Sequence, residues 1–151
     1  MAKLKKNITY YESIGRRKSA IARVRLYLSS AKAKLPKEIA GEAKKGNIYI
    51  NGMLIEKYFP SEVQQKKYAL PFELTDAVDR FIVTALVRGG GIHGQLEALQ
   101  LGLSRALEMV HEDNRKKLKP FGLLMRDQRV RERRKVGTGV RARRQKQSPK
   151  R

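Results

Sequence analysis

Arginine and lysine dominate the end of the chain, and their chemistry is that of phosphate binding. Residues 126–151 hold 12 basic and 2 acidic residues. A guanidinium is a planar fork of donors that fits phosphate bidentately and stacks on bases. Because no aromatic residue follows Phe121, we expect phosphate contacts and recognition of RNA shape rather than stacking on rings. The candidate RNA-binding residues here are Arg126, Arg129, Arg131, Arg133, Arg134, Lys135, Arg141, Arg143, Arg144 and Lys146.

A second basic cluster lies near the start of the chain. Gly15-Arg16-Arg17-Lys18 has the composition of a turn, and residues 20–28 then alternate between apolar and other side chains, as in a half-buried strand. Solvated loop charges are the alternative interpretation, but the basic C-terminal segment favours an RNA-binding patch. The residues of this expected patch are Arg16, Arg17, Lys18, Arg23 and Arg25.

A glycine-rich segment at 89–94 matches the pattern G-x-G-x-x-G between an expected strand and an expected helix. Dinucleotide binding would need a second parallel strand with an acidic residue at its end, whereas the helix runs into basic sequence, so we reject it. Glycine amides at a helix N-terminus can still bind an RNA phosphate. A tight turn is the alternative role of the glycines, and His93 could simply cap that turn. The candidate contacts are Gly89, Gly90, Gly91, His93 and Gln95.

The remaining polar residues form no recognisable catalytic arrangement. The chain has no cysteine, which excludes disulfides and thiolate metal sites. No Ser-His-Asp, metal-ligand or P-loop pattern occurs, and Asp76 and Asp79 are typical of turn or cap residues. We therefore expect a protein that is not an enzyme and that uses no metal and no cofactor.

The distribution of charge indicates a polyanionic partner. The chain has 35 Lys and Arg against 14 Asp and Glu, a net charge of +21. Residues 1–25 carry +7 and residues 126–151 carry +10, which leaves +4 for the hundred residues between. Nucleic acid is the usual polyanion, and a membrane surface is disfavoured because the basic segment has no apolar face. No apolar run approaches the ~20 residues of a membrane span, and no signal peptide is recognisable, so we expect a cytoplasmic protein without a membrane partner.

The hydrophobic pattern predicts the elements that position these residues. We expect one globular domain over residues 1–125 and a basic tail over 126–151, disordered without RNA because it buries too little apolar surface. Residues 31–46 are expected to form a long hairpin loop, and prolines are expected to limit the two shorter helices. The expected strands are 8–12, 20–28, 47–51 and 80–88, and the expected helices are 53–59, 61–69, one through Leu96–Val110 and a turn or two within 113–121.

Four segments in order resemble the bacterial-type S-nine family of small-subunit ribosomal proteins. They are GRRKSAIARVRLY (15–27), YINGMLIEKYF (49–59), GGGIHGQLEALQLGLSRAL (89–107) and GLLMRDQRVRERRKVGTGVRARRQKQ (122–147), followed by the terminal pair Lys150-Arg151. The resemblance implies an α/β fold of the α+β two-layer sandwich type, like domain two of ribosomal protein S-five. It implies a four-stranded sheet with helices on one face, a left-handed βαβ crossover and a long extended basic tail.

The resemblance also implies a role in translation. Such a protein is a structural constituent of the small ribosomal subunit that binds small-subunit ribosomal RNA in the head, beside neighbouring head proteins. Its tail contacts peptidyl-site transfer RNA through its last residues, which correspond to Lys150 and Arg151 here. This chain departs from the family ending Gln-Phe-Ser-Lys-Arg, because it has Ser148-Pro149 before the final pair, and its loop at 31–46 is longer.

A free nucleic-acid-binding or RNA-chaperone protein is the alternative that charge alone allows. The ordered motifs favour the ribosomal interpretation. Stoichiometric comigration with small subunits at high salt would distinguish the two.

Overall fold

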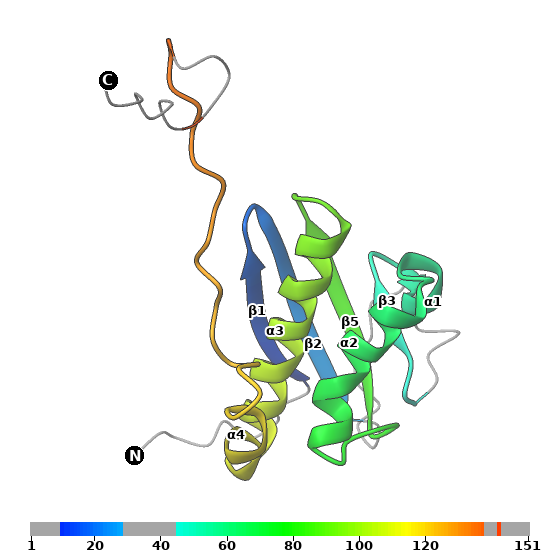
Figure 1. Ribbon diagram of the computed structural model, residues 1–151. Helices are drawn as coiled ribbons and strands as arrows, with labels where there is room; N and C mark the ends of the chain where they lie inside the picture. Colours follow the sequence, from blue (N-terminus) through cyan, green and yellow to red (C-terminus); the bar gives the residue numbers. More distant parts are fainter. Residues whose placement is uncertain (1–9, 29–44, 138–141, 143–151) are drawn as a thin grey trace.

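A mixed sheet flanked by helices forms the body of the protein in the computed structural model, which describes residues 10–28, 45–137 and 142 (Figure 1). The strands are β1 (Tyr10–Arg17), β2 (Ala20–Leu28), β3 (Ile48–Ile50), β4 (Met53–Leu54) and β5 (Phe81–Arg88). The helices are α1 (Ile55–Tyr58), α2 (Glu62–Leu74), α3 (Ile92–Val110) and α4 (Asp113–Leu118).

The strand order across the sheet is β1-β2-β5-β3-β4. The pairs β1–β2, β2–β5 and β3–β4 are antiparallel, whereas β3 and β5 are parallel. Because β5 lies between β2 and β3, the segment that joins these two strands is not a hairpin loop, so that prediction was wrong; its residues 31–44 lie outside the described ones. The parallel pair is joined through α1 and α2, and the handedness of this crossover stays a prediction.

The described sheet has five strands rather than the predicted four, because the chain turns back at Asn51-Gly52. Both turn residues have positive φ, 49° and 85°. Such a two-residue turn favours a tight hairpin, and it pairs Ile50 with Met53. The helix expected at 53–59 therefore begins two residues late, as α1 at Ile55.

Strand β1 is longer than the expected strand at 8–12, and residues 15–17 belong to it rather than to a turn. The pairing with β2 continues to Arg17↔Ala20, so the turn is limited to Lys18 and Ser19. Gly15 permits this course, because a Cβ at this position would collide with the Ala98 carbonyl of α3. The missing side chain thus lets helix α3 lie directly on β1.

Helix α2 runs through Pro71 to Leu74, so the predicted limit at this proline was wrong. A proline has no N–H to donate to the carbonyl four residues earlier, here that of Lys67. The side-chain amide of Gln100 on α3 donates to that carbonyl at 2.9 Å instead. A neighbouring helix therefore satisfies the carbonyl that the proline leaves open.

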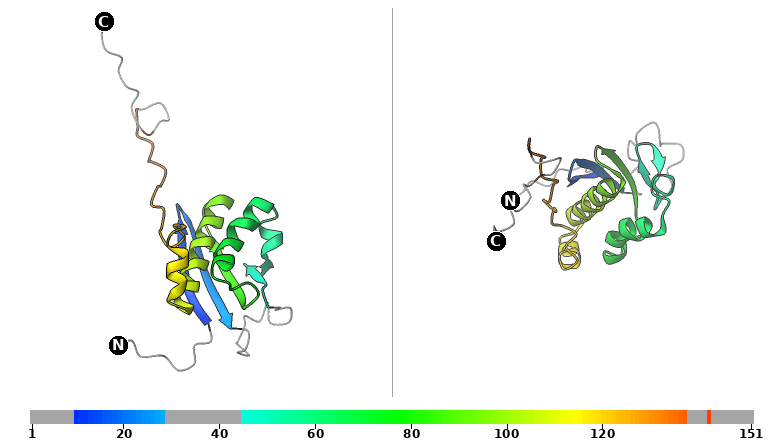
Figure 2. Two further views of the ribbon diagram at one scale, coloured as in Figure 1. Left: turned by 60° about the horizontal axis from the view of Figure 1, so that its bottom comes forward. Right: turned by 45° about the horizontal axis from the view of Figure 1, so that its top comes forward.

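The hydrophobic core lies between one face of the sheet and helices α2 and α3, which lie side by side on that face (Figure 2). Alternate residues of β2 point into it, and so do leucines of α3 at three- and four-residue spacing, as predicted. Burying each such leucine contributes roughly 1.5–3 kcal/mol. The residues on β2 are Ala20, Ala22, Val24 and Leu26, and those on α3 are Leu96, Leu99, Leu103 and Leu107.

Candidate nucleic-acid interface

The β1–β2 turn and the glycine-rich loop meet at one end of the sheet. Lys18 is exposed in the turn with φ of 51°, and Gly89 and Gly90 have φ of 72° and 65°. A Cβ on Gly89 would lie 2.5 Å from the Ser19 carbonyl oxygen, and one on Gly90 would lie 2.9 Å from the Cβ of Ala20. Packing against the turn therefore explains why these two positions require glycine. Gly91 has no such neighbour within 4 Å, and its backbone lies open beside exposed His93.

The sheet face opposite the core carries a second group of cations. The register places Arg16, Ile21 and Arg88 in one row, and Ile14, Arg23 and Leu86 in the next. The three arginines are exposed, and none of their side chains has a hydrogen bond or ion pair with another residue in the described stretches. We call Arg16, Arg23 and Arg88 the free sheet arginines. Arg88 was not predicted as an RNA contact. It lies two positions after Leu86 in the expected strand, and this spacing would have placed both residues on the same sheet face.

Two other predicted RNA contacts are engaged within the fold. The Nε of Arg25 donates to the Glu12 carboxylate at 2.5 Å, and its guanidinium lies 4.9 Å from the centre of the Tyr10 ring. The hydrogen bond to Glu12 raises the pKa of Arg25 above its usual value. Gln95 donates to the Gly89 carbonyl at 3.1 Å and accepts from the Tyr58 hydroxyl at 2.9 Å. These contacts hold the strands and the glycine loop in place.

Arg17 fixes the point at which the tail leaves the domain. Its side chain is only 12% exposed and lies between two carboxylates, with Nε 2.5 Å from Glu97 and Nη2 3.0 Å from Asp127. Its Nη1 also donates to the Arg129 backbone carbonyl at 2.9 Å. We call Arg17, Glu97, Asp127 and Arg129 the tail clamp. It joins the first residues of the tail to strand β1 and helix α3.

The carboxylate of Asp127 is the centre of this clamp. It accepts from the Arg129 guanidinium at 2.7 Å and from the Arg129 backbone N–H at 2.9 Å. These hydrogen bonds, with added attraction from Arg17, hold the pKa of Asp127 well below its usual range. Asp127 thus holds two arginines in place, one on the domain and one in the tail.

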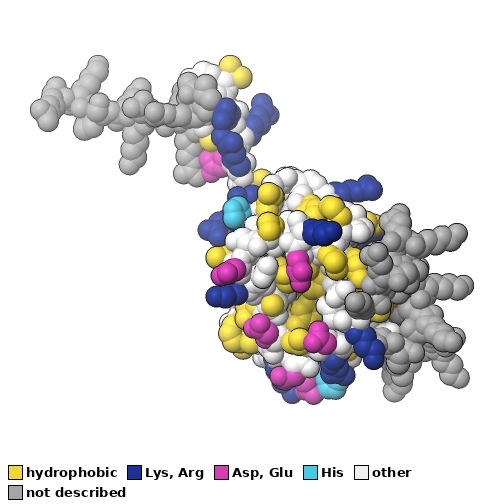
Figure 3. All heavy atoms as spheres, turned by 90° about the vertical axis from the view of Figure 1, so that its right-hand side faces the viewer, with side chains coloured by type: hydrophobic (Ala, Val, Ile, Leu, Met, Phe, Trp, Pro, Cys, Tyr) yellow, Lys and Arg dark blue, Asp and Glu magenta, His cyan; other side chains and the backbone are white. Residues whose placement is uncertain are grey.

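Beyond the clamp the chain extends away from the domain with its cations exposed. Residues 128–135 have no helix or strand, and they lead past the end of the sheet that carries the β1–β2 turn (Figure 1). Lys and Arg side chains crowd this segment in Figure 3, whereas acidic and basic side chains mix on the domain surface beside it. The exposed arginines are Arg126, Arg131, Arg133 and Arg134. The predicted contacts at Arg141, Arg143, Arg144, Lys146, Lys150 and Arg151 lie outside the described residues.

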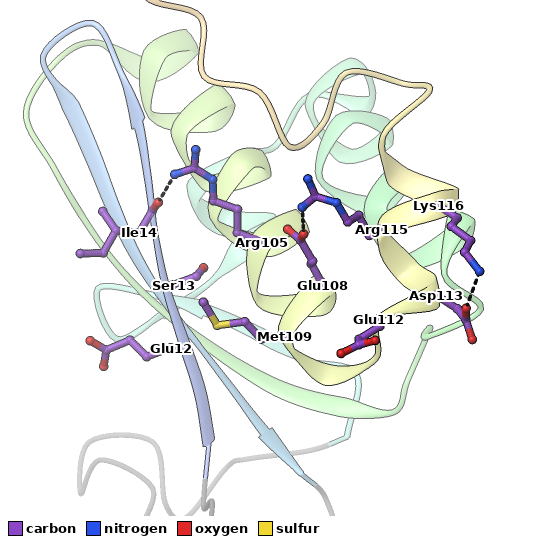
Figure 4. Close-up of a pocket in the computed structure, with 10 residues that line it drawn as sticks. All are labelled: Glu12, Ser13, Ile14, Arg105, Glu108, Met109, Glu112, Asp113, Arg115 and Lys116. Carbon is purple, nitrogen blue, oxygen red and sulfur yellow. Dashed lines mark hydrogen bonds and ion pairs between the residues drawn. The ribbon is translucent and has the colours of Figure 1, made fainter. Parts of the chain in front are cut away.

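Two hollows open between β1 and α3, and they differ in charge. The first, of about 1150 Å³, is completed by α4 and shown in Figure 4. Three cations and four carboxylates line it, a net charge of −1, and ion pairs join Glu108 to Arg115 and Asp113 to Lys116. A polyanion gains little there. We call it the acidic hollow, and its carboxylates are Glu12, Glu108, Glu112 and Asp113.

The second hollow, of about 280 Å³, lies at the root of the tail. Four cations and two carboxylates line it, a net charge of +2. We call it the basic hollow, and its charged residues are Arg16, Arg17, Lys67 and Arg129 with Glu97 and Asp127. Neither the charge count nor the aromatic residue Phe121 on its wall was foreseen from sequence, because the hollow is assembled from four separate segments.

Neither a metal site nor a membrane span is found within the part of the chain that the structure describes. No group of three or more His, Asp or Glu there is arranged to hold a metal ion. None of the helices among these residues combines the length and apolar character needed to cross a bilayer.

Comparisons with known proteins bear on nearly the whole chain. The family model "Ribosomal protein S9/S16" matches residues 15–151. The "Small ribosomal subunit protein uS9" of Gemmatimonas aurantiaca is 42% identical over 126 residues, 83% of this chain and 86% of that protein. The protein of the same name from Ureaplasma urealyticum serovar 10 is 39% identical over 133 residues, 88% of this chain and 89% of that one.

Proposed function

The chain belongs to the ribosomal protein S9/S16 family, and we propose that it binds small-subunit ribosomal RNA through its clamped basic tail and its free sheet arginines. Membership makes it a structural, non-enzymatic constituent of the small ribosomal subunit, located in the cytoplasm within the ribosome and acting in translation. Its neighbours there are ribosomal RNA and other ribosomal proteins.

The observation that carries the proposal is the contrast between the root of the tail and the residues after it. The root is held by Arg17, Asp127 and Arg129, while the arginines that follow are exposed. An extended cationic strand can enter crowded RNA where a globular domain cannot. Each phosphate it neutralises releases counterions, and this release supplies much of the affinity of a basic protein for nucleic acid.

The end of the sheet supplies the second contact surface. Several groups that could contact RNA lie at or near this end. They are the exposed residues Lys18 and His93, the open backbone at Gly91, and the free sheet arginines. Phosphate contacts of this kind position a protein on RNA without reading its bases. We propose that this surface docks on ribosomal RNA in the head of the subunit, with the tail entering the RNA beside it.

The finer parts of the proposal follow from the family resemblance. We propose that Lys150 and Arg151 contact the transfer RNA in the peptidyl site, and that the crossover from β3 to β5 is left-handed. The departure at Ser148-Pro149 changes the approach to the terminal pair, because proline biases the preceding residue to an extended backbone. Both terminal charges are nonetheless retained.

Crosslinking in purified small subunits that carry transfer RNA tests this function directly. The expected result is crosslinks from residues 126–147 to ribosomal RNA and from residues 150–151 to the anticodon stem of the transfer RNA. Crosslinks from 150–151 to ribosomal RNA alone would contradict the transfer RNA contact. Absence of the protein from the subunits would favour a free nucleic-acid-binding protein instead.

A further inference from the structure

Phe121 presents an aromatic ring on the wall of the basic hollow. The residue is 58% exposed, and it lies just before the chain enters the tail. The surrounding wall is mixed: four cations and two carboxylates share it with the apolar residues Leu101, Leu123 and Met125, so the ring lies beside charge rather than in a purely apolar patch. An exposed ring among cations is the combination by which proteins bind unpaired nucleotides, because bases stack on the ring and phosphates contact the cations.

One cation of the hollow remains available for a phosphate. Lys67 is exposed and has no hydrogen bond or ion pair through its side chain to another described residue, whereas the side chain of Arg16 lies on the opposite face of the sheet. The two carboxylates of the hollow are occupied, since Glu97 is bonded to Arg17, and Asp127 to Arg17 and Arg129. The positive charge that faces an incoming anion in the hollow is therefore that of Lys67.

We propose that the basic hollow binds one unpaired nucleotide of RNA, with the base on the ring of Phe121 and a flanking phosphate on Lys67. A volume of about 280 Å³ is slightly below the ~300–1000 Å³ of small-molecule sites, a size that suits a single base. The inference rests on the proposed RNA-binding function and adds to it. It assigns a stacking contact to a region where sequence indicated phosphate contacts alone.

The acidic hollow provides an internal comparison. It lies along the same strand and helix, and it also presents an exposed apolar residue, Met109, at 57%. Its net charge is negative and it has no aromatic ring. An acidic peptide could use the cations of the basic hollow but gains nothing specific from an aromatic ring, so RNA is the occupant that uses both features.

Binding of the full-length protein to two RNA hairpins tests the inference. One hairpin has a single bulged base, the other is fully paired with the same stem, and fluorescence anisotropy gives the dissociation constants. F121A is expected to weaken binding of the bulged hairpin about tenfold, within the range for loss of one base stack, and to change the paired hairpin less than twofold. F121Y should bind like the unsubstituted protein, and the matched control M109A should leave both hairpins unchanged. Removing the charge of Lys67 with K67A should lower the salt slope for the bulged hairpin by about 0.7.

The possible outcomes separate this inference from the proposed function. Equal binding of F121A and the unsubstituted protein to the bulged hairpin overturns the nucleotide site, while salt-dependent binding of both RNAs still supports the proposed function. Equal weakening on both hairpins also overturns the site, because it indicates an effect on the tail or fold. If the unsubstituted protein binds neither RNA, both proposals fail. Binding of an oligoglutamate peptide that F121A weakens, with RNA binding unchanged, would assign the hollow to an acidic protein segment.

Discussion

Arg17 and Arg16 are neighbours in sequence but belong to different parts of the molecule. In strand β1 adjacent side chains point to opposite faces of the sheet. Arg17 therefore reaches the helix side, where Glu97 and Asp127 bind it, while Arg16 lies with Arg23 and Arg88 among the free sheet arginines. One arginine stabilises the fold, and the other remains available to a partner. A high count of basic residues thus overstates the number that can bind RNA.

The largest effect is expected from the exposed arginines of the tail. Replacing Arg131, Arg133 and Arg134 together with glutamine should lower the salt slope of RNA binding by about 2 to 3. Affinity at physiological salt should fall by about a hundredfold, as follows from that change in slope. Binding titrations over a range of salt concentrations measure both. The free energy of unfolding should change by less than about 0.5 kcal/mol, as is usual for surface substitutions.

Removal of the clamp residue Arg17 should lower the stability of the protein more than its affinity for RNA. R17A leaves Glu97 without its partner and removes one of the two arginines bonded to Asp127. We expect a loss of about 2 kcal/mol in the free energy of unfolding, by comparison with hydrogen bonds to charged groups. Urea unfolding measures this loss. R16A serves as the matched control, because it removes the same charge one position away without a bonded partner. Equal destabilisation by the two variants would contradict the division between clamp and free arginines.

A smaller effect is expected at the edge of the RNA-binding surface. R88Q removes one free sheet arginine and should lower the salt slope of RNA binding by at most about 1. Its stability should match that of the unsubstituted protein within about 0.5 kcal/mol. R25Q is the comparison, because Arg25 is bonded to Glu12, and it should destabilise the protein more than it weakens RNA binding. The reverse result would place Arg25 rather than Arg88 at the interface.

The smallest effect concerns the ionised carboxylate of Asp127. The pKa of Asp127 is lowered in the folded protein, so its ionised form stabilises the clamp above its unfolded pKa of about 3.9. That contribution is lost as the pH falls through the lower folded value. Limited proteolysis between residues 127 and 137 should therefore be faster in D127N than in the unsubstituted protein at pH 7. A rate difference that is absent at pH 7 would show that Asp127 does not hold the tail.

The elements that bury one continuous face could be predicted from sequence. Helix α3 repeats leucine at helical spacing, and β2 places Ala20, Ala22, Val24 and Leu26 at every second position, so local pattern and final burial agree. Pro71 was misleading because its effect depends on Gln100, which lies on another helix. The local sequence shows that a proline lacks an N–H. It does not show that the distant Gln100 amide donates to the Lys67 carbonyl in its place.

The candidate site was predicted in composition but not in geometry. The basic tail and the cluster at Arg16 and Arg17 were predicted from the sequence. Residues 15–18 were predicted as a turn, however, so the directions of their side chains were not predicted. The pairing of Arg17 with Asp127 joins positions 110 residues apart, and no local pattern indicates it. The basic hollow could not be predicted from the sequence, because the tail root, α2, α3 and β1 each contribute residues to its wall.

The tail clamp also limits the distance from the domain at which Lys150 and Arg151 can lie. Arg151 is 24 positions after Asp127, a separation of at most about 80 Å at roughly 3.3 Å per residue. Because the clamp fixes one end, docking of the domain confines Lys150 and Arg151 to a volume of that radius. Within this volume the proposed contact with transfer RNA would benefit from an effective concentration that free diffusion does not provide. A variant that opened the clamp would enlarge the volume and lower that concentration without changing Lys150 or Arg151.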